Sequence, residues 1–129
     1  MIRGRTPAGA LGITLDARDA PALARFYSNL LGWELVEDSP SWCTLRTPGS
    51  PVTLAVKGEP LHERPAWPSE PGAPQMQAHL EVPVDDLEAA VADAVLLGAE
   101  LPDHQPQPHV RVLFDPAGHP FCLYTEPDA

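Results

Sequence analysis

The first regular pattern in the chain is an alternation of apolar and polar residues over 11–18, the period of a β-strand with one buried face. Apolar residues then recur three and four positions apart over 23–31, which is the period of a helix with one apolar stripe. Asp19 is the predicted N-cap of this helix and Gly32 its C-terminal stop. A strand that leads directly into a helix is therefore predicted.

The same pattern returns in the second half of the chain. Residues 80–84 alternate again, Asp86 takes the N-cap position, and a second helical stripe over 87–97 ends at Gly98. The two helix ends are nearly identical, reading LLGWEL and LLGAEL. Such an internal repeat indicates two copies of one module.

Each predicted helix is followed by three strand-like segments, so each half reads βαβββ. The segments are 33–36, 42–46 and 52–56 in the first half, and 99–101, 110–114 and 121–125 in the second. Module one is placed at 11–57 and module two at 77–126. Residues 58–76 between them are rich in proline, which excludes a regular helix and predicts an extended linker.

Composition indicates a single domain over 1–129. The chain is 43% hydrophobic, enough for one core, and it is short for two independent domains, so the modules are expected to share a core. A formal charge of −10 disfavours nucleic acid and anionic membrane surfaces. No apolar run approaches the ~18 residues of a membrane span, so a cytoplasmic protein without a membrane partner is expected.

Alternation also defines a second face for each predicted sheet, pointing away from the helices. Its ionisable groups are too many for a dry core, because unpaired buried charges are costly. The face is either a ligand site or an open surface that meets water, and periodicity favours neither. Its predicted members are Gly12, Thr14, Asp16, Trp42, Thr44, Arg46, Thr53, Ala55 and Lys57 in module one, and His79, Glu81, Arg111, Leu113, Cys122, Tyr124 and Glu126 in module two.

The paired pattern, with DAPALARFYSNLLGWEL, HLEVPVDDLEAAVADAVLLGAEL and DPAGHPFCLY, resembles the vicinal-oxygen-chelate superfamily over about residues 11–126. This superfamily includes glyoxalase I, bleomycin-resistance proteins and extradiol dioxygenases. The resemblance implies an α+β fold in which two tandem βαβββ modules form an incomplete, cup-like mixed β-barrel with the helices outside. It further implies a small-molecule ligand and a homodimer, whose barrels close within one chain or by exchange of modules.

The resemblance also implies a divalent metal with two ligands from each module. Those positions fall on Gly12 and Thr53 in module one and on His79 and Cys122 in module two. Glycine has no side chain, threonine offers a weak hydroxyl, and Cys122 replaces the usual carboxylate, so the usual site is expected to be incomplete and no cofactor is expected. The alternative is a rearranged divalent-metal site of His79, Glu81 and Cys122.

Two main functions are weighed. The first is binding of a small organic molecule without the usual metal, as in resistance-type proteins. The second is an enzyme, a lyase, isomerase or dioxygenase, with a nonstandard metal site or with acid–base catalysis by His79 and Glu81. A third is an interaction module with a decayed site. The residues expected to contact the ligand are Trp42, Arg46, Trp67, Arg111, Cys122 and Tyr124.

Several of these residues also have a purely structural interpretation. His79 can be a histidine hydrogen-bonded inside the barrel, and Cys122, like Cys43, is expected to be a buried thiol rather than a nucleophile or half of a disulfide. His119 is expected to fix the turn before the last strand.

Three residues in particular have competing interpretations. Trp67 covers the mouth of the cup or a subunit interface, or packs on its own module. Arg46 and Arg111 bind an anionic group, or form salt bridges with Asp16 and Glu81.

Overall fold

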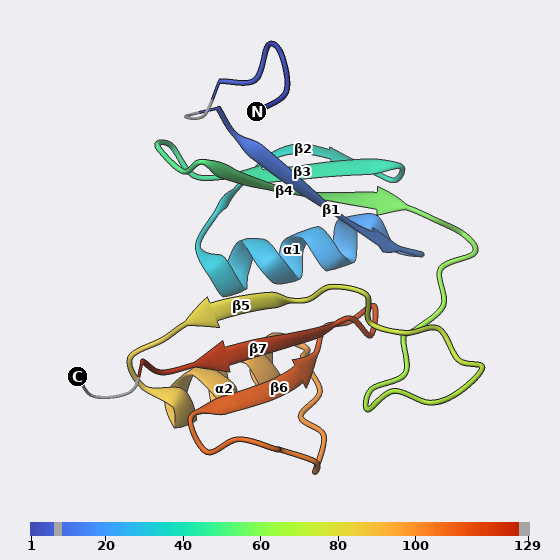
Figure 1. Ribbon diagram of the computed structural model, residues 1–129, viewed down its shortest axis with the longest axis vertical. Coiled ribbons are helices and arrows are strands. Elements are labelled where there is room, and N and C mark those ends of the chain that lie inside the picture. Colours follow the sequence, from blue (N-terminus) through green and yellow to red (C-terminus); the bar gives the residue numbers. More distant parts are fainter. Residues whose placement is uncertain (7–8, 127–129) are drawn as a thin grey trace. The chain divides into compact units, whose positions relative to one another are not determined.

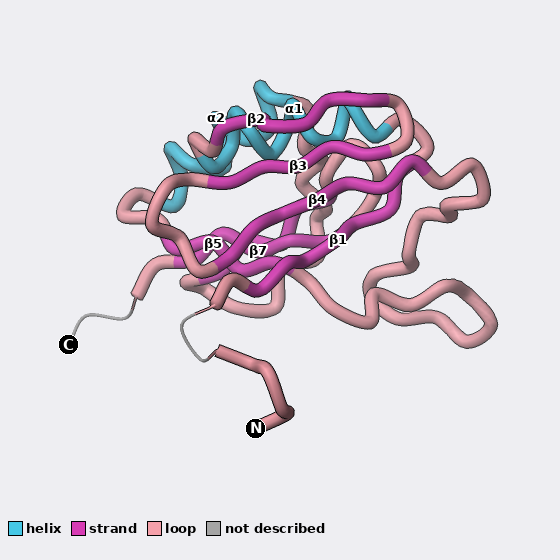
Figure 2. The backbone as a smooth tube through the Cα atoms, turned by 90° about the horizontal axis from the view of Figure 1, so that it is seen from above, coloured by secondary structure: helices cyan, strands magenta, loops and turns pink. Residues whose placement is uncertain are grey.

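All the elements predicted for module one form in a computed structural model of the chain, which describes residues 1–6 and 9–126 (Figure 1). Its sheet has the strand order β1-β4-β3-β2, with β1 parallel to β4 and the other pairs antiparallel. Figure 2 shows these strands side by side in that order. The strands are β1 (Leu11–Ala17), β2 (Glu34–Ser39), β3 (Trp42–Arg46) and β4 (Val52–Gly58).

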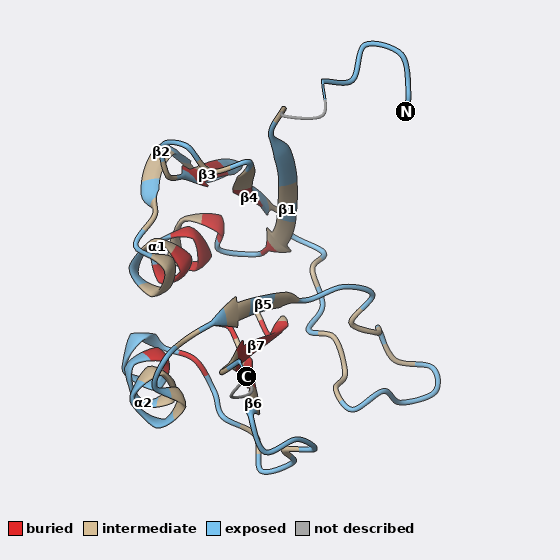
Figure 3. Ribbon diagram, turned by 60° about the vertical axis from the view of Figure 1, so that its left-hand side comes forward, coloured by how far each residue is buried: buried red, intermediate tan, exposed pale blue. Residues whose placement is uncertain are grey.

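Helix α1 (Ala20–Leu31) begins and ends where the sequence predicts. The Asp19 carboxylate accepts a hydrogen bond from the Ala22 N–H at 3.1 Å, and Gly32 adopts the left-handed conformation at φ 71°. The helix packs on one face of the sheet, and its inward side is buried (Figure 3). The buried residues of the helix are Ala20, Leu23, Ala24, Phe26 and Tyr27, and those of the sheet are Ala17, Cys43, Leu45, Leu54, Ala55 and Val56.

The second sheet repeats the arrangement of the first. Strands β5 (Leu80–Pro83), β7 (Pro120–Tyr124) and β6 (Val110–Phe114) lie in the order β5-β7-β6, with β5 parallel and β6 antiparallel to β7. This order matches β1-β4-β3. The internal repeat seen in the sequence is therefore a repeat of strand topology, and the predicted α+β class is confirmed.

Helix α2 (Leu87–Leu97) lies behind the second sheet in Figure 1. The Asp86 carboxylate accepts from the Ala89 N–H at 3.1 Å, and Gly98 is left-handed at φ 118°, so both predicted ends are confirmed. Among the residues that the structure describes, neither helix is long and apolar enough to cross a membrane.

The predicted strand over 99–101 is reduced to a single bridge between Glu100 and Phe114. Two backbone hydrogen bonds of 2.9 and 2.8 Å join these residues, and Pro102 then interrupts the pairing because it has no N–H. The side chain of Gln105 continues along the same edge of β6. It accepts from the Val112 N–H and donates to the Val112 carbonyl, both at 2.9 Å. A side chain thus takes the place of the missing strand.

The chain divides into two units, Met1–His62 and Glu63–Ala129, each with its own helix and sheet. The division falls within the predicted linker 58–76, so most of that linker belongs to unit 2. The predicted shared core and cup-like barrel concern how the two units combine, and they stay predictions.

Candidate functional site

The helix-free face of the second sheet, opposite α2, is defined by strand register. Glu81 on β5 pairs with Cys122 on β7, and Cys122 pairs in turn with Val112 on β6. Residues directly opposite one another point to the same face, and alternate residues along each strand join them. The helix-free face therefore carries His79, Glu81 and Pro83 from β5 and the residue before it, Pro120, Cys122 and Tyr124 from β7, and Val110, Val112 and Phe114 from β6.

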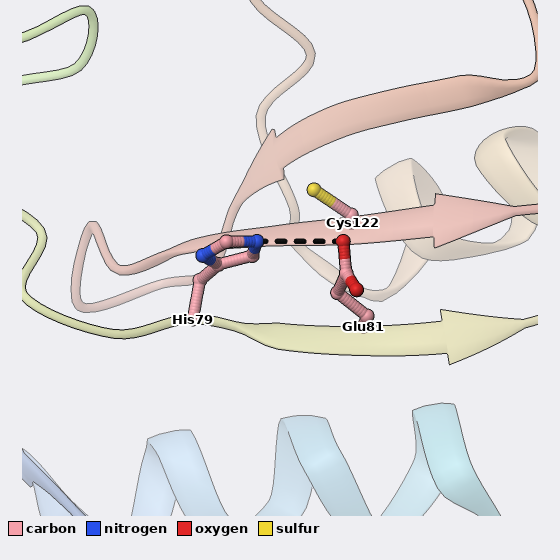
Figure 4. A group of neighbouring side chains, drawn as sticks. All are labelled: His79, Glu81 and Cys122. Atoms are coloured by element: carbon pink, nitrogen blue, oxygen red, sulfur yellow. Dashed lines mark ion pairs between the residues drawn. The ribbon is translucent and has the colours of Figure 1, made fainter.

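Three polar side chains meet on this face where β5 lies beside β7 (Figure 4). His79 Nε2 lies 3.5 Å from Glu81 Oε1, and one ligand atom of each of His79, Glu81 and Cys122 lies within 4.8 Å of the others. The His79 side chain is 33% exposed and that of Glu81 60%, whereas Cys122 is only 7% exposed. The structure thus brings together the three residues that the sequence proposed for a rearranged site.

Both cysteines are free and buried, as the sequence predicts. Burial raises the pKa of the Cys122 thiol, and the nearby Glu81 carboxylate raises this pKa further. Burial likewise raises the pKa of the Cys43 thiol, whose sulfur donates to the Ser39 carbonyl at 3.3 Å. A protonated thiol is a poor nucleophile, so these environments favour a structural thiol over nucleophilic catalysis at either residue.

The prediction that Arg111 and Leu113 share this face is wrong. Arg111 pairs with Leu123 and Leu113 with Phe121, so both lie on the side opposite Glu81 and Cys122. Alternation within one strand gives two sets of residues, but only pairing with the next strand decides which set faces which side.

The side chain of Arg111 stabilises the loop before β6. Its guanidinium donates to the carbonyls of Gln107, Pro108 and Val110 at 3.3, 3.2 and 2.8 Å. The guanidinium of Arg111 thus bonds these three carbonyls and does not form the ion pair with Glu81 that was considered from the sequence. Glu81 has His79 as its neighbour instead.

In unit 1 the helix-free face of the sheet is the one predicted. Trp42 pairs with Lys57, which pairs with Asp16, and the next row holds Thr44, Ala55 and Thr14. Trp42 is 39% exposed. Arg46 is exposed opposite Glu34, with which it pairs across strands β2 and β3.

The two metal-ligand positions implied for module one lie side by side. Gly12 pairs with Thr53, and a Cβ at Gly12 would meet the Thr53 hydroxyl oxygen at 3.4 Å. The two positions are therefore close enough to belong to one site, but neither residue supplies an imidazole or a carboxylate. The residues present do not fit the superfamily's set of two ligands from each module.

Trp67 packs on its own unit, one of the alternatives considered for it. Its ring lies 5.5 Å from that of His104 and 6.3 Å from that of Phe114. The Arg64 guanidinium lies 5.9 Å from the centre of the Phe114 ring and pairs with Glu100 at 3.2 Å. These contacts anchor the middle of the predicted linker to one end of the helix-free face.

The turn before β7 is fixed by a residue that the sequence analysis did not single out. The Asp115 carboxylate is 2% exposed and accepts from the N–H groups of Ala117 and His119 at 2.9 and 3.0 Å. His119 contributes its backbone to this turn. The aspartate at the start of DPAGHP could have predicted this role, since the side chain of an aspartate commonly accepts hydrogen bonds from the backbone of the turn that it opens.

A hollow of about 500 Å³ lies where β5 leads into α2. The N-terminus of α2 favours a bound anion in this hollow. The three carboxylates that line the hollow repel an anion, so the two electrostatic effects oppose each other. The lining residues are Pro83, Val84, Asp85, Asp86, Ala89, Ala90 and Asp93.

The Glyoxalase-like domain family matches residues 12–124 of the chain. No curated protein matches the sequence. FosX, the fosfomycin resistance protein of Listeria monocytogenes, has a TM-score of 0.67 at 16% identity, over 98% of this chain and 96% of that one. The antibiotic binding protein TnmS3 from Streptomyces sp. CB03234 has a TM-score of 0.58 at 20% identity, over 92% and 95%.

A glyoxalase-related enzyme from Fulvimarina pelagi has a TM-score of 0.65 at 22% identity, over 92% of this chain and 88% of that one. At these identities the solved structures show a shared fold. Because the family match extends over most of the sequence and the repeated strand topology agrees with it, the chain belongs to the glyoxalase-like family of the vicinal-oxygen-chelate superfamily.

Proposed function

We propose that the protein binds a small organic molecule on the helix-free face of the second sheet, without the four-ligand metal site of its superfamily. The observation that carries this proposal is the meeting of His79, Glu81 and Cys122 on one face. Small-molecule sites are typically apolar surfaces with a few convergent polar groups that orient the ligand. Val112, which is buried, and the half-buried Tyr124 are apolar neighbours of the three polar groups on this face.

The charges on this face favour certain ligands. Glu81 is a carboxylate, and Arg111, expected to bind an anionic group here, points to the other side of the sheet. Arg64, at the Phe114 end, is already paired with Glu100 at 3.2 Å. A ligand that offers a hydrogen-bond donor or a positive charge to Glu81 therefore suits the face better than an anion does.

Two structural neighbours support a small organic ligand in general, because one is an antibiotic binding protein and another a fosfomycin resistance protein. Trp42, Arg46 and Trp67 stay predicted contacts of the ligand. Trp67 is anchored at the end of the same face through Phe114. The homodimer and the cytoplasmic location stay predictions as well.

Ligand screening tests the proposal. Thermal shift with a panel of antibiotics and aromatic amines should identify a compound that raises the melting temperature, and calorimetry should give its affinity. His79→Ala should weaken that binding about tenfold, as expected for loss of about 1.4 kcal/mol from a polar contact. His109→Ala, the same change in an exposed loop, should leave affinity unchanged. Equal affinity in both variants would place the ligand elsewhere.

A second candidate function, acid–base catalysis, is favoured by the 3.5 Å approach of His79 to Glu81. A carboxylate beside an imidazole fixes its orientation and supports it as a general base. The two functions differ in turnover: the binding protein returns its ligand unchanged, whereas the enzyme converts it. If product forms, His79→Ala should abolish it while leaving the circular dichroism spectrum unchanged.

A further inference from the structure

Three side chains of unit 2 able to bind a metal ion converge within that unit. His79 Nε2 is 3.5 Å from Glu81 Oε1, and ligand atoms of His79, Glu81 and Cys122 lie within 4.8 Å of one another. Glu81 and Cys122 are direct partners on the parallel pair β5 and β7, and His79 immediately precedes β5. The main-chain ladder of the sheet therefore fixes where the Glu81 and Cys122 side chains originate, and His79 lies one residue before it.

The spacing suits a small divalent ion. Zinc binds nitrogen and oxygen at about 2.0–2.1 Å and sulfur at about 2.3 Å, so the ligand atoms of a tetrahedral site lie roughly 3.3–3.7 Å apart. The distance between His79 and Glu81 already falls in this range. The other ligand-atom distances are at most 4.8 Å, and the Glu81 side chain, 60% exposed, is free to adjust to a bound ion.

The donor types discriminate between metals. A cysteine sulfur favours zinc and other thiophilic ions, whereas Mg²⁺ and Mn²⁺ prefer oxygen ligands. In unit 1 the corresponding positions offer only Gly12 and the Thr53 hydroxyl. The set in unit 2 thus differs from that of the superfamily in its sulfur donor, in the participation of Glu81 and in its origin in a single module.

We propose that His79, Glu81 and Cys122 form a three-ligand site, contained in unit 2, for a thiophilic divalent ion such as Zn²⁺. Binding forms a metal–sulfur bond, and the thiol proton passes to solvent. Three protein ligands leave a fourth position for water or for an atom of a small ligand, as in catalytic rather than structural zinc sites. This site uses the same three side chains as the organic-molecule proposal, but metal binding can be measured without any organic ligand.

Cobalt titration of the full chain, prepared without a histidine tag, tests the site directly. Co²⁺ bound to a thiolate has a sulfur-to-metal charge-transfer absorption in the near ultraviolet, which sites of only nitrogen and oxygen lack. We expect this absorption to saturate at about one ion per chain, to disappear when Zn²⁺ is added, and to be lost in Cys122→Ser. Mn²⁺ should not compete with the cobalt.

Variants of the exposed ligands keep the test valid if Cys122→Ser fails to fold. His79→Ala and Glu81→Gln should each weaken Zn²⁺ binding roughly a hundredfold, because even groups behind the ligands contribute about 10–100-fold. Cys43→Ser removes the other buried thiol and Thr53→Ala the hydroxyl of module one. Both should retain the cobalt absorption, with circular dichroism confirming the fold of every variant.

The proposal would be overturned by absorption that survives in Cys122→Ser, by Mn²⁺ affinity equal to that of Zn²⁺, or by loss of binding in Thr53→Ala. Weak uptake of several ions per chain, unaffected by His79→Ala, would indicate adventitious surface binding and would overturn it equally. Failure of ligand screening bears only on the organic-molecule proposal, since the cobalt signal needs no organic ligand.

Discussion

Gly12 and Thr53 stand opposite each other on the parallel strands β1 and β4, and a Cβ at Gly12 would lie 3.4 Å from the Thr53 hydroxyl oxygen. These are the two module-one positions that the resemblance to the superfamily predicts for metal ligands. The pairing of Gly12 with Thr53 is consistent with their belonging to one site. Because they are a glycine and a threonine, unit 1 offers no imidazole or carboxylate there. A Cβ added at Gly12 would be close to the Thr53 hydroxyl, but this hydroxyl can rotate away.

We therefore expect Gly12→Ala to be tolerated. Glycine within a strand costs about 0.5–1 kcal/mol relative to alanine, so the free energy of unfolding should stay the same or rise by up to that amount. The matched control is Gly58→Ala in β4, where the added Cβ would overlap the Pro40 carbonyl oxygen. Gly58→Ala should lower the urea midpoint clearly. A loss in Gly12→Ala as large as in Gly58→Ala would contradict the register of β1 and β4.

Gly118→Ala should destabilise unit 2 for two separable reasons. Gly118 is left-handed at φ 88°, which costs a non-glycine residue about 1–2 kcal/mol. The new Cβ would also lie 2.6–2.8 Å from atoms of the Arg64 side chain. In an Arg64→Ala background only the backbone strain should remain, so urea unfolding should show a smaller loss. Equal losses in both backgrounds would mean that Arg64 does not pack on this turn.

Gln105→Glu should lower stability by about 1–3 kcal/mol, the cost of leaving partly buried polar groups unpaired. The carboxylate can still accept from the Val112 N–H, but it cannot donate to the carbonyls of Pro102 and Val112. Gln107→Glu makes the same change at an exposed position and should be nearly neutral in thermal unfolding. A neutral Gln105→Glu would show that the edge of β6 does not need its side-chain partner.

Stability should fall as the solution becomes alkaline. Burial raises the pKa of Cys43 above its ordinary value of 9.0, so the folded chain keeps a proton that the unfolded chain loses. The unfolded state then binds fewer protons, and the free energy of unfolding decreases as pH rises above about 9. Cys43→Ala should reduce this slope in urea titrations across the alkaline range, whatever its effect at neutral pH. An unchanged slope would mean that Cys43 does not contribute.

Local chemistry accounts for the success of the sequence analysis at the helix ends. Asp19 and Asp86 cap their helices because an aspartate before an apolar stripe can accept from N–H groups one turn on. Gly32 and Gly98 end them because glycine enters the left-handed region without a Cβ penalty. These interactions span only a few residues, so the residue types predict them directly.

The candidate site was predictable where it depended on one strand. Period-two alternation places His79 and Glu81 on the same side of the chain, and the structure finds them 3.5 Å apart. The same rule misplaced Arg111, because its side depends on pairing with Leu123 of another strand. The strand predicted over 99–101 is reduced to a bridge because its pairing depends on another segment: its partner is Phe114, and Gln105 occupies the next position on the edge of β6.

The sequence by itself thus determined the repeated order of elements apart from the strand over 99–101, the boundaries of the others within a few residues, the family and the identity of the reactive side chains. Only the tertiary structure decided that Glu81 stands beside Cys122, that Arg111 faces the other way and that Trp67 packs on Phe114. The physical reason is that side-chain periodicity is a property of one segment. Register, by contrast, is set by hydrogen bonds and packing between segments far apart in the chain.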